Sequence, residues 1–206
     1  MPGKQTLTDQ LDFQQDPVTA GPQVKVTVNI TERMGAPLTF DAANYEELYQ
    51  QVAARAAQRK EAGSVTCDLS ADLKTDASGA LTAAVIDAPL VTMLPAWPQK
   101  ARQPQADQAK FDAWRASVEA HETTHRDIYK REYPKFKTAI VGPDEKAGDA
   151  QFKAVSAAAE AAQDAFDASS QPAPLAAPGG IIQVPRRNAT DVTTAASADP
   201  DPYADL

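Results

Sequence analysis

Apolar and polar residues alternate along several stretches in the first half of the chain. Three stretches share this pattern, residues 23–31, 64–73 and 80–93. A period of two predicts β-strands that bury one face, and a further short strand is predicted at 38–40. The last of the three stretches is expected to form one or two strands, because Pro89 should break or bulge it. The pattern as a whole predicts a small, mostly antiparallel sheet.

Helical spacing dominates the rest of the chain. Apolar residues recur every three or four positions over residues 44–60, 105–132 and 144–168. This spacing predicts three amphipathic helices, and Asp41 is expected to cap the first of them. The middle helix carries one inward-facing stripe, made of Phe111, Trp114, Val118, His121, His125 and Ile128. The chain is therefore predicted to be α+β, with a small sheet followed by a long helix and a second helix that packs on it.

The two ends of the chain differ in composition from this central part. Residues 1–22 are polar and contain glycine and proline, which is typical of a flexible leader. Residues 169–206 are rich in Pro, Ala, Gly, Ser and Thr, and we predict a largely disordered tail in which residues 181–184 could dock as a single strand. The organisation predicted is a leader, one domain over residues 23–168, and a tail.

Chemistry concentrates in the middle helix, at His121-Glu122-Thr123-Thr124-His125, which contains both histidines of the chain. On a helix, an H-E-x-x-H segment places the two imidazoles on one face, where they can share a zinc ion. The intervening Glu122 could then act as the general base and afterwards as the acid in peptide-bond hydrolysis. The alternative is a pair of core histidines that are satisfied by hydrogen bonds alone.

A zinc site needs a third protein ligand, and the chain has no third histidine. Glu160 lies in the next predicted helix and is followed four residues later by Asp164, a spacing found in gluzincin-type peptidases. The alternative for this pair is a solvated acidic patch. Tyr129, one turn after His125, is a candidate donor to the oxyanion of a tetrahedral intermediate.

Charge and composition narrow the classes of partner. The formal net charge is −8, which argues against nucleic acid or an anionic membrane as the main partner. The first residues lack the apolar stretch of a secretory signal. We therefore expect a protein that is cytoplasmic or is exported by a system that needs no such signal. Cys67 is the only cysteine, so no internal disulfide is possible.

Residues 64–168 resemble a bacterial domain-of-unknown-function family described as predicted secreted zinc-dependent proteases. The resemblance is carried by Leu94-Pro95-Ala96-Trp97, Phe111-Asp112-Ala113-Trp114 and Ala120-His121-Glu122-Thr123-Thr124-His125-Arg126-Asp127. It implies a zinc site of the metallopeptidase type, with a peptide or protein as substrate. Members of this family generally carry a secretion signal.

The same resemblance implies another third ligand. Family members end the second helix with Tyr-Asp, followed by a short Thr-x-His-Gly turn. This chain has Phe166-Asp167 at the corresponding place and lacks the histidine. Asp167 is then the ligand candidate that survives, and the choice between Asp167 and Glu160 stays open.

A second resemblance concerns the leader. Residues 3–11 are similar to the start of some proteins linked to extracellular contractile injection systems. This similarity implies export as a cargo, with an injection apparatus as partner. The favoured function is zinc-dependent peptide hydrolysis. The alternatives are a catalytically impaired zinc-binding structural or interaction module, and an effector cargo of a contractile injection system.

Overall fold

The central strand β5 (Leu81–Met93) organises a four-stranded sheet in the computed structural model, which describes residues 23–58 and 61–179. Strand β1 (Lys25–Met34) pairs with one edge of β5 in parallel. Strands β3 (Ser64–Cys67) and β4 (Ser70–Thr75) pair with the other edge, both antiparallel. The sheet is thus mostly antiparallel, as predicted, and it precedes the long helix in the chain.

The prediction that Pro89 would break or bulge its strand was wrong. β5 runs without interruption through Pro89, which pairs with Thr31 of β1. The interruption lies instead in the neighbouring chain, at residues 68–69 between β3 and β4. Because Cys67 pairs with Leu90 and Ser70 with Asp87, Asp68 falls opposite Pro89. The missing N–H of the proline therefore removes no ladder hydrogen bond on that side.

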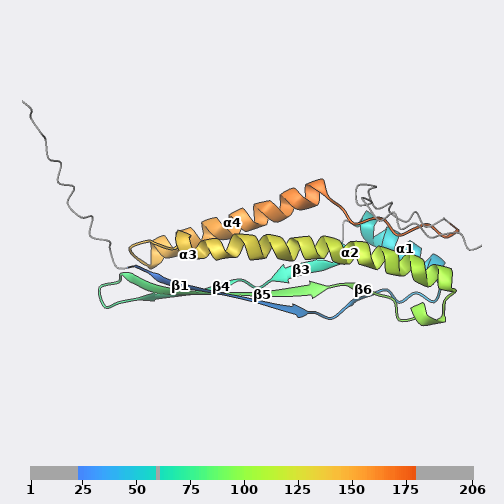
Figure 1. The fold of residues 1–206 in the computed structure, drawn as a ribbon, viewed down its shortest axis with the longest axis horizontal. Helices are drawn as coiled ribbons and strands as arrows, with labels where there is room; N and C mark the ends of the chain where they lie inside the picture. Colours follow the sequence, from blue (N-terminus) through green and yellow to red (C-terminus); the bar gives the residue numbers. More distant parts are fainter. Residues whose placement is uncertain (1–22, 59–60, 180–206) are drawn as a thin grey trace, which may run out of the picture.

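Helices lie on one face of this sheet (Figure 1). The elements outside the sheet are α1 (Tyr45–Ala57), α2 (Gln105–Glu132), α3 (Phe136–Ala139), α4 (Glu145–Ser169), the 3-10 turns η1 (Lys100–Arg102) and η2 (Tyr133–Lys135), and a short parallel pair of β2 (Leu38–Thr39) with β6 (Pro95–Ala96). The bounds of α2 match the prediction. Asn44, and not Asp41, caps α1, because the Asn44 side chain accepts a hydrogen bond from the Glu47 N–H at 3.0 Å.

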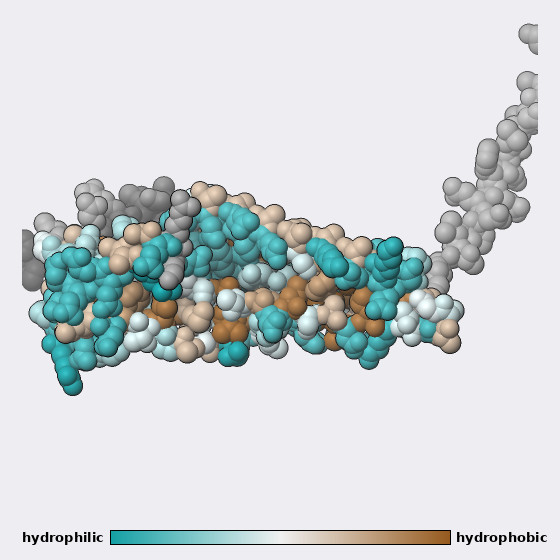
Figure 2. All heavy atoms as spheres, turned by 180° about the vertical axis from the view of Figure 1, so that it is seen from behind, coloured by the Kyte–Doolittle hydropathy of each residue, from teal (hydrophilic) through white to brown (hydrophobic). Residues whose placement is uncertain are grey.

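The core consists of two clusters, and α2 contributes residues to both. One cluster joins α1 to the first half of α2 and includes Leu48, Trp97 and Trp114. The other joins the sheet to the helices around Phe136 and includes Leu90. Seen from behind (Figure 2), the most hydrophobic residues form a band along the middle of the molecule, between the helices and the outer side of the sheet. The stretch of α2 that holds the two histidines lies between the two clusters.

The segment that follows α4 differs from the predicted tail. Residues 170–178, which we call the strap, run without regular secondary structure and lie against α1 and α2. Leu175 is only 5% exposed within the first core cluster, and the Tyr45 hydroxyl donates to the Ala176 carbonyl at 2.6 Å. One large apolar side chain and one partly buried hydrogen bond thus hold a proline-rich segment that composition alone predicted to be disordered.

The predicted leader and the rest of the predicted tail, including the strand proposed at 181–184, lie outside the described residues. Within residues 23–58 and 61–179, no helix has both the length and the apolar composition that a membrane span requires.

Candidate metal centre

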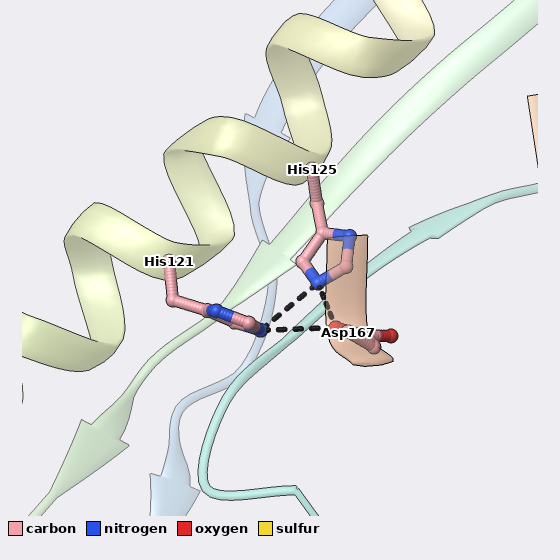
Figure 3. A group of neighbouring side chains, drawn as sticks. All are labelled: His121, His125 and Asp167. Atoms are coloured by element: carbon pink, nitrogen blue, oxygen red, sulfur yellow. Dashed lines mark hydrogen bonds and ion pairs between the residues drawn. The ribbon is translucent and has the colours of Figure 1, made fainter. Parts of the chain in front are cut away.

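Two histidines and one aspartate bring their ligand atoms together between α2 and α4 (Figure 3). His121 and His125 are one helical turn apart on α2, and their Nε2 atoms are 3.0 Å from each other. Asp167, in the last turns of α4, places Oδ1 at 3.2 Å from His121 Nε2 and at 2.9 Å from His125 Nε2. Each histidine is 8% exposed and thus largely shielded from water, whereas the Asp167 side chain is 34% exposed.

Gln163 orients His125 from the opposite helix. The His125 Nδ1–H donates to Gln163 Oε1, and the Gln163 amide nitrogen donates to the His125 carbonyl at 3.1 Å. The first of these bonds assigns the imidazole proton to Nδ1. His125 Nε2 therefore carries a lone pair, directed at His121 Nε2 and Asp167 Oδ1. A ring nitrogen held by such a partner is characteristic of metal-binding histidines.

The three converging atoms are better suited to binding a cation than to forming hydrogen bonds with one another. Of these three atoms, Asp167 Oδ1 is buried and has no hydrogen-bond partner. Buried polar atoms without a partner are costly, unless an ion or a water satisfies them. Ligands at about 2.0–2.1 Å in a tetrahedral set are about 3.3 Å apart, close to the 2.9–3.2 Å separations observed here. The three residues could therefore hold a metal ion.

The protonation state of His121 favours this role. Burial lowers the pKa of His121, and the neighbouring His125 lowers it further, while Asp167 opposes both effects. A lowered pKa keeps the imidazole neutral, as a metal ligand must be. The ring of Phe166 stacks on His121 with centroids 4.7 Å apart and meets the edge of His125 at 4.9 Å. Phe166 thus keeps water from one side of both imidazoles.

Glu122 lies next to these ligands and is itself buried. Its side chain is 2% exposed, and its Oε2 has no hydrogen-bond partner. Burial raises the pKa of Glu122 to about 7; Glu61 and Asp167 add to the rise, and His125 and Arg126 oppose it. A carboxyl group with such a pKa can both accept and return a proton near neutral pH.

Gly63 allows the chain to pass closely over Glu122. A Cβ atom at this position would lie 2.8 Å from Glu122 Oε1 and 2.6 Å from Val118 Cγ1. Real Cβ atoms do not approach other atoms so closely, so the absence of a side chain at Gly63 is required for this packing. The start of β3 is thereby placed directly against the candidate base.

A cleft of about 610 Å³ leads to this group of residues. His121, Glu122 and Asp167 line it, together with side chains from α1 and residues 171–175 of the strap. The volume lies within the range of small-ligand and peptide sites. A ligand in the cleft would be adjacent to both the candidate metal ligands and the candidate base.

Of the two third-ligand candidates, only Asp167 reaches the histidines. Glu160 is exposed and lies seven residues earlier on α4, about 10 Å away along the helix axis. Because α4 runs antiparallel to α2 (Figure 1), Glu160 lies beyond the histidines, toward the C-terminal end of α2. There it contributes to the raised pKa values of Tyr129 and Tyr133.

Tyr129, the predicted oxyanion donor, lies away from the cleft. It is not among the lining residues, and its ring packs against Tyr133 with centroids 5.1 Å apart, in the second core cluster. Burial is the main cause of its raised pKa, and Asp167 contributes to the rise. Tyr129 is thus within electrostatic range of the group, but the structure gives it no hydrogen bond to His121, His125 or Asp167.

Sequence reasoning missed two residues of the site. Gln163 is not among the residues that the sequence singled out, and Phe166 entered only through the family resemblance. A signal was present, because Ala159, Gln163 and Asp167 recur every four residues and share one face of α4. A polar residue within an otherwise apolar face marks a position where a buried hydrogen bond is needed.

Comparisons with known proteins show the family of the chain but no activity. No curated protein and no solved structure matches the chain. A family model matches residues 37–173, which adds β2 and α1 to the region in which the family resemblance was noted. The chain therefore belongs to the family described as "Bacterial protein of unknown function (DUF922)".

Proposed function

We propose that this protein is a zinc-dependent peptidase. The observation that carries the proposal is the convergence of two imidazole nitrogens and a carboxylate oxygen beside a buried glutamate, at the end of a cleft. Imidazole and carboxylate donors in threes are typical of catalytic zinc sites, which keep one further position for water or substrate.

His121, His125 and Asp167 would hold the ion. When bound, zinc acts as a Lewis acid, which polarises a carbonyl group and lowers the pKa of a bound water to about 7. Gln163 holds His125 in the tautomer that binds through Nε2. Phe166 covers one side of both imidazoles and restricts access of water from that side.

Glu122 would transfer a proton from the attacking water to the leaving amine. Its unpartnered Oε2 would accept a proton from the attacking water and then return it to the leaving amine, so the residue ends each cycle as it began. The pKa of about 7 suits both transfers near neutral pH. Glu122 lines the cleft, so a bound peptide would lie within reach of it.

A peptide suits this protein better than a nucleic acid does. The formal net charge of −8 disfavours nucleic acid, and the cleft is large enough for a segment of a few residues. The H-E-x-x-H motif and the family resemblance both point to the same chemistry.

The experiment begins with metal content by mass spectrometry for the purified protein, His125→Ala and Glu122→Gln. We expect about one equivalent of zinc in the wild type and in Glu122→Gln, and a loss in His125→Ala. A peptide library should then be cleaved by the wild type, and Glu122→Gln should be slower by about 10²–10⁴-fold. The absence of bound zinc, or unchanged activity in Glu122→Gln, would refute the proposal.

A second function is favoured by the burial of both imidazoles under Phe166. In this alternative the zinc site is structural, and the domain binds a partner without hydrolysing it. Bound zinc together with no cleavage of any peptide would support this alternative. Export as an injection-system cargo stays a prediction, since the leader on which it depends lies outside the described residues.

A further inference from the structure

The cleft beside the candidate metal centre has two kinds of lining. Away from the metal ligands its surface is apolar, formed by Phe40, Val52, Ala53, Ala56, Trp114 and Leu175. These residues come from α1, α2, the strap and the segment before α1. This part of the cleft is wide and apolar and carries little charge. A ligand bound here would therefore gain binding free energy mainly by burying its own apolar atoms.

Charge in the cleft is concentrated near the metal ligands and is mostly negative. Glu61, Glu122 and Asp167 line this end. Arg55 also lines the cleft, and its guanidinium Nε donates to the Glu61 carbonyl at 2.6 Å. An acidic side chain entering the apolar part would lose its hydration there without gaining a charged partner, and would therefore be disfavoured.

The strap gives the apolar part of the cleft a wall that is already ordered before a ligand binds. Leu175 is anchored in the core, and the Tyr45 hydroxyl holds the Ala176 carbonyl. The Ser117 hydroxyl, which donates to the Trp114 carbonyl at 2.8 Å, also lies 3.4 Å from the Ala173 carbonyl. Since the wall opposite α1 is held at these points, a ligand would not have to order it on binding, which favours affinity.

We propose that the apolar part of the cleft selects substrates with a large, uncharged apolar side chain, of leucine or phenylalanine size, next to the scissile bond. This inference rests on the proposed peptidase function and specifies its substrate class. Burying such a side chain, compared with glycine at the same position, should strengthen binding by about 10- to 100-fold. An acidic side chain should bind more weakly than glycine.

The test uses three peptide hydroxamates that differ only in the side chain beside the metal-binding group: isobutyl, hydrogen or carboxymethyl. Their affinities for the full-length, zinc-loaded protein are measured by calorimetry, so no activity is needed. We expect the isobutyl compound to bind at least 10-fold more tightly than the hydrogen compound, and the carboxymethyl compound to bind most weakly.

Two neighbouring alanines of α1 provide matched variants. Ala53 and Ala54 are both exposed, but only Ala53 lines the cleft. Ala53→Trp should fill the apolar part and reduce the isobutyl advantage to below about 3-fold, while Ala54→Trp should keep it. Binding of the hydrogen compound by both variants reports that fold and zinc are intact.

The outcomes distinguish a failure of the proposed selectivity from a failure of the proposed peptidase function. Equal affinities of the three compounds, or equal effects of the two tryptophans, would overturn the proposed selectivity and leave the peptidase proposal standing. Failure of all three compounds to bind the zinc-loaded wild type would instead count against the peptidase site itself.

Discussion

Replacing Glu122 by glutamine should stabilise the metal-free protein at pH 8 and have little effect at pH 4.5. Glu122 is 2% exposed, its Oε2 has no hydrogen-bond partner, and burial is the main reason that its pKa is raised to about 7. Ionisation of this group is therefore unfavourable in the folded protein. A glutamine of the same shape has no charge to bury.

The sign follows from proton binding in the two states. With a pKa of about 7 when folded and 4.5 when unfolded, the folded protein binds more protons between these pH values. The wild-type stability therefore decreases as the pH rises through this window, and the loss is complete above about pH 7. The full loss corresponds to about 3 kcal/mol, and it should be absent in Glu122→Gln.

The assay is urea or thermal unfolding of both proteins in the presence of a chelator, at pH 4.5, 6 and 8. The stability difference between variant and wild type should grow with pH by up to about 3 kcal/mol, or about 6–12 °C in Tm for a chain of this size. Titrating groups that do not interact with Glu122 cancel, because they are common to both proteins, whereas the groups whose charges act on Glu122 contribute to the difference between the two curves. Stability curves that stay parallel over this range would show that Glu122 is not desolvated as described, and the argument for its role as a base would lose its electrostatic support.

Further predictions concern the ligands and the strap. Asp167→Ala should abolish stoichiometric zinc binding, whereas Glu160→Ala should retain it, as measured by metal analysis after dialysis; equal retention would remove Asp167 from the site. Gln163→Leu keeps the buried volume but loses both hydrogen bonds to His125, and should weaken zinc binding by about 10- to 100-fold in a chelator competition; unchanged affinity would mean that the orientation of His125 does not depend on Gln163. Leu175→Ala should reduce the free energy of unfolding by about 2–5 kcal/mol in urea titrations, and a loss below about 1 kcal/mol would show that the strap is not part of the core.

Local pattern was sufficient for the two long helices and for the two histidines of the site, but it did not show that residues 64–73 divide into β3 and β4. A helix places residues four apart on one face whatever surrounds it, so the spacing of His121 and His125 predicted their shared direction, and their place in the apolar stripe predicted their burial. The same local periodicity located α2 and α4 to within a residue. The alternation in residues 80–93 likewise predicted strand, although the effect of Pro89 depended on where the neighbouring strand was interrupted.

The tertiary structure decided everything that joins distant parts of the chain. Glu160 and Asp167 point in nearly the same direction from α4, and only the way α4 lies along α2 determines which of them meets the histidines. The same contact turns Gln163 into the partner of His125. The burial of Leu175 depends on a gap between α1 and α2, so a segment with the composition of a tail becomes a wall of the cleft. Sequence periodicity determines which way a side chain faces, whereas the position of a third ligand depends on the packing of two helices, and that packing is settled by the whole core.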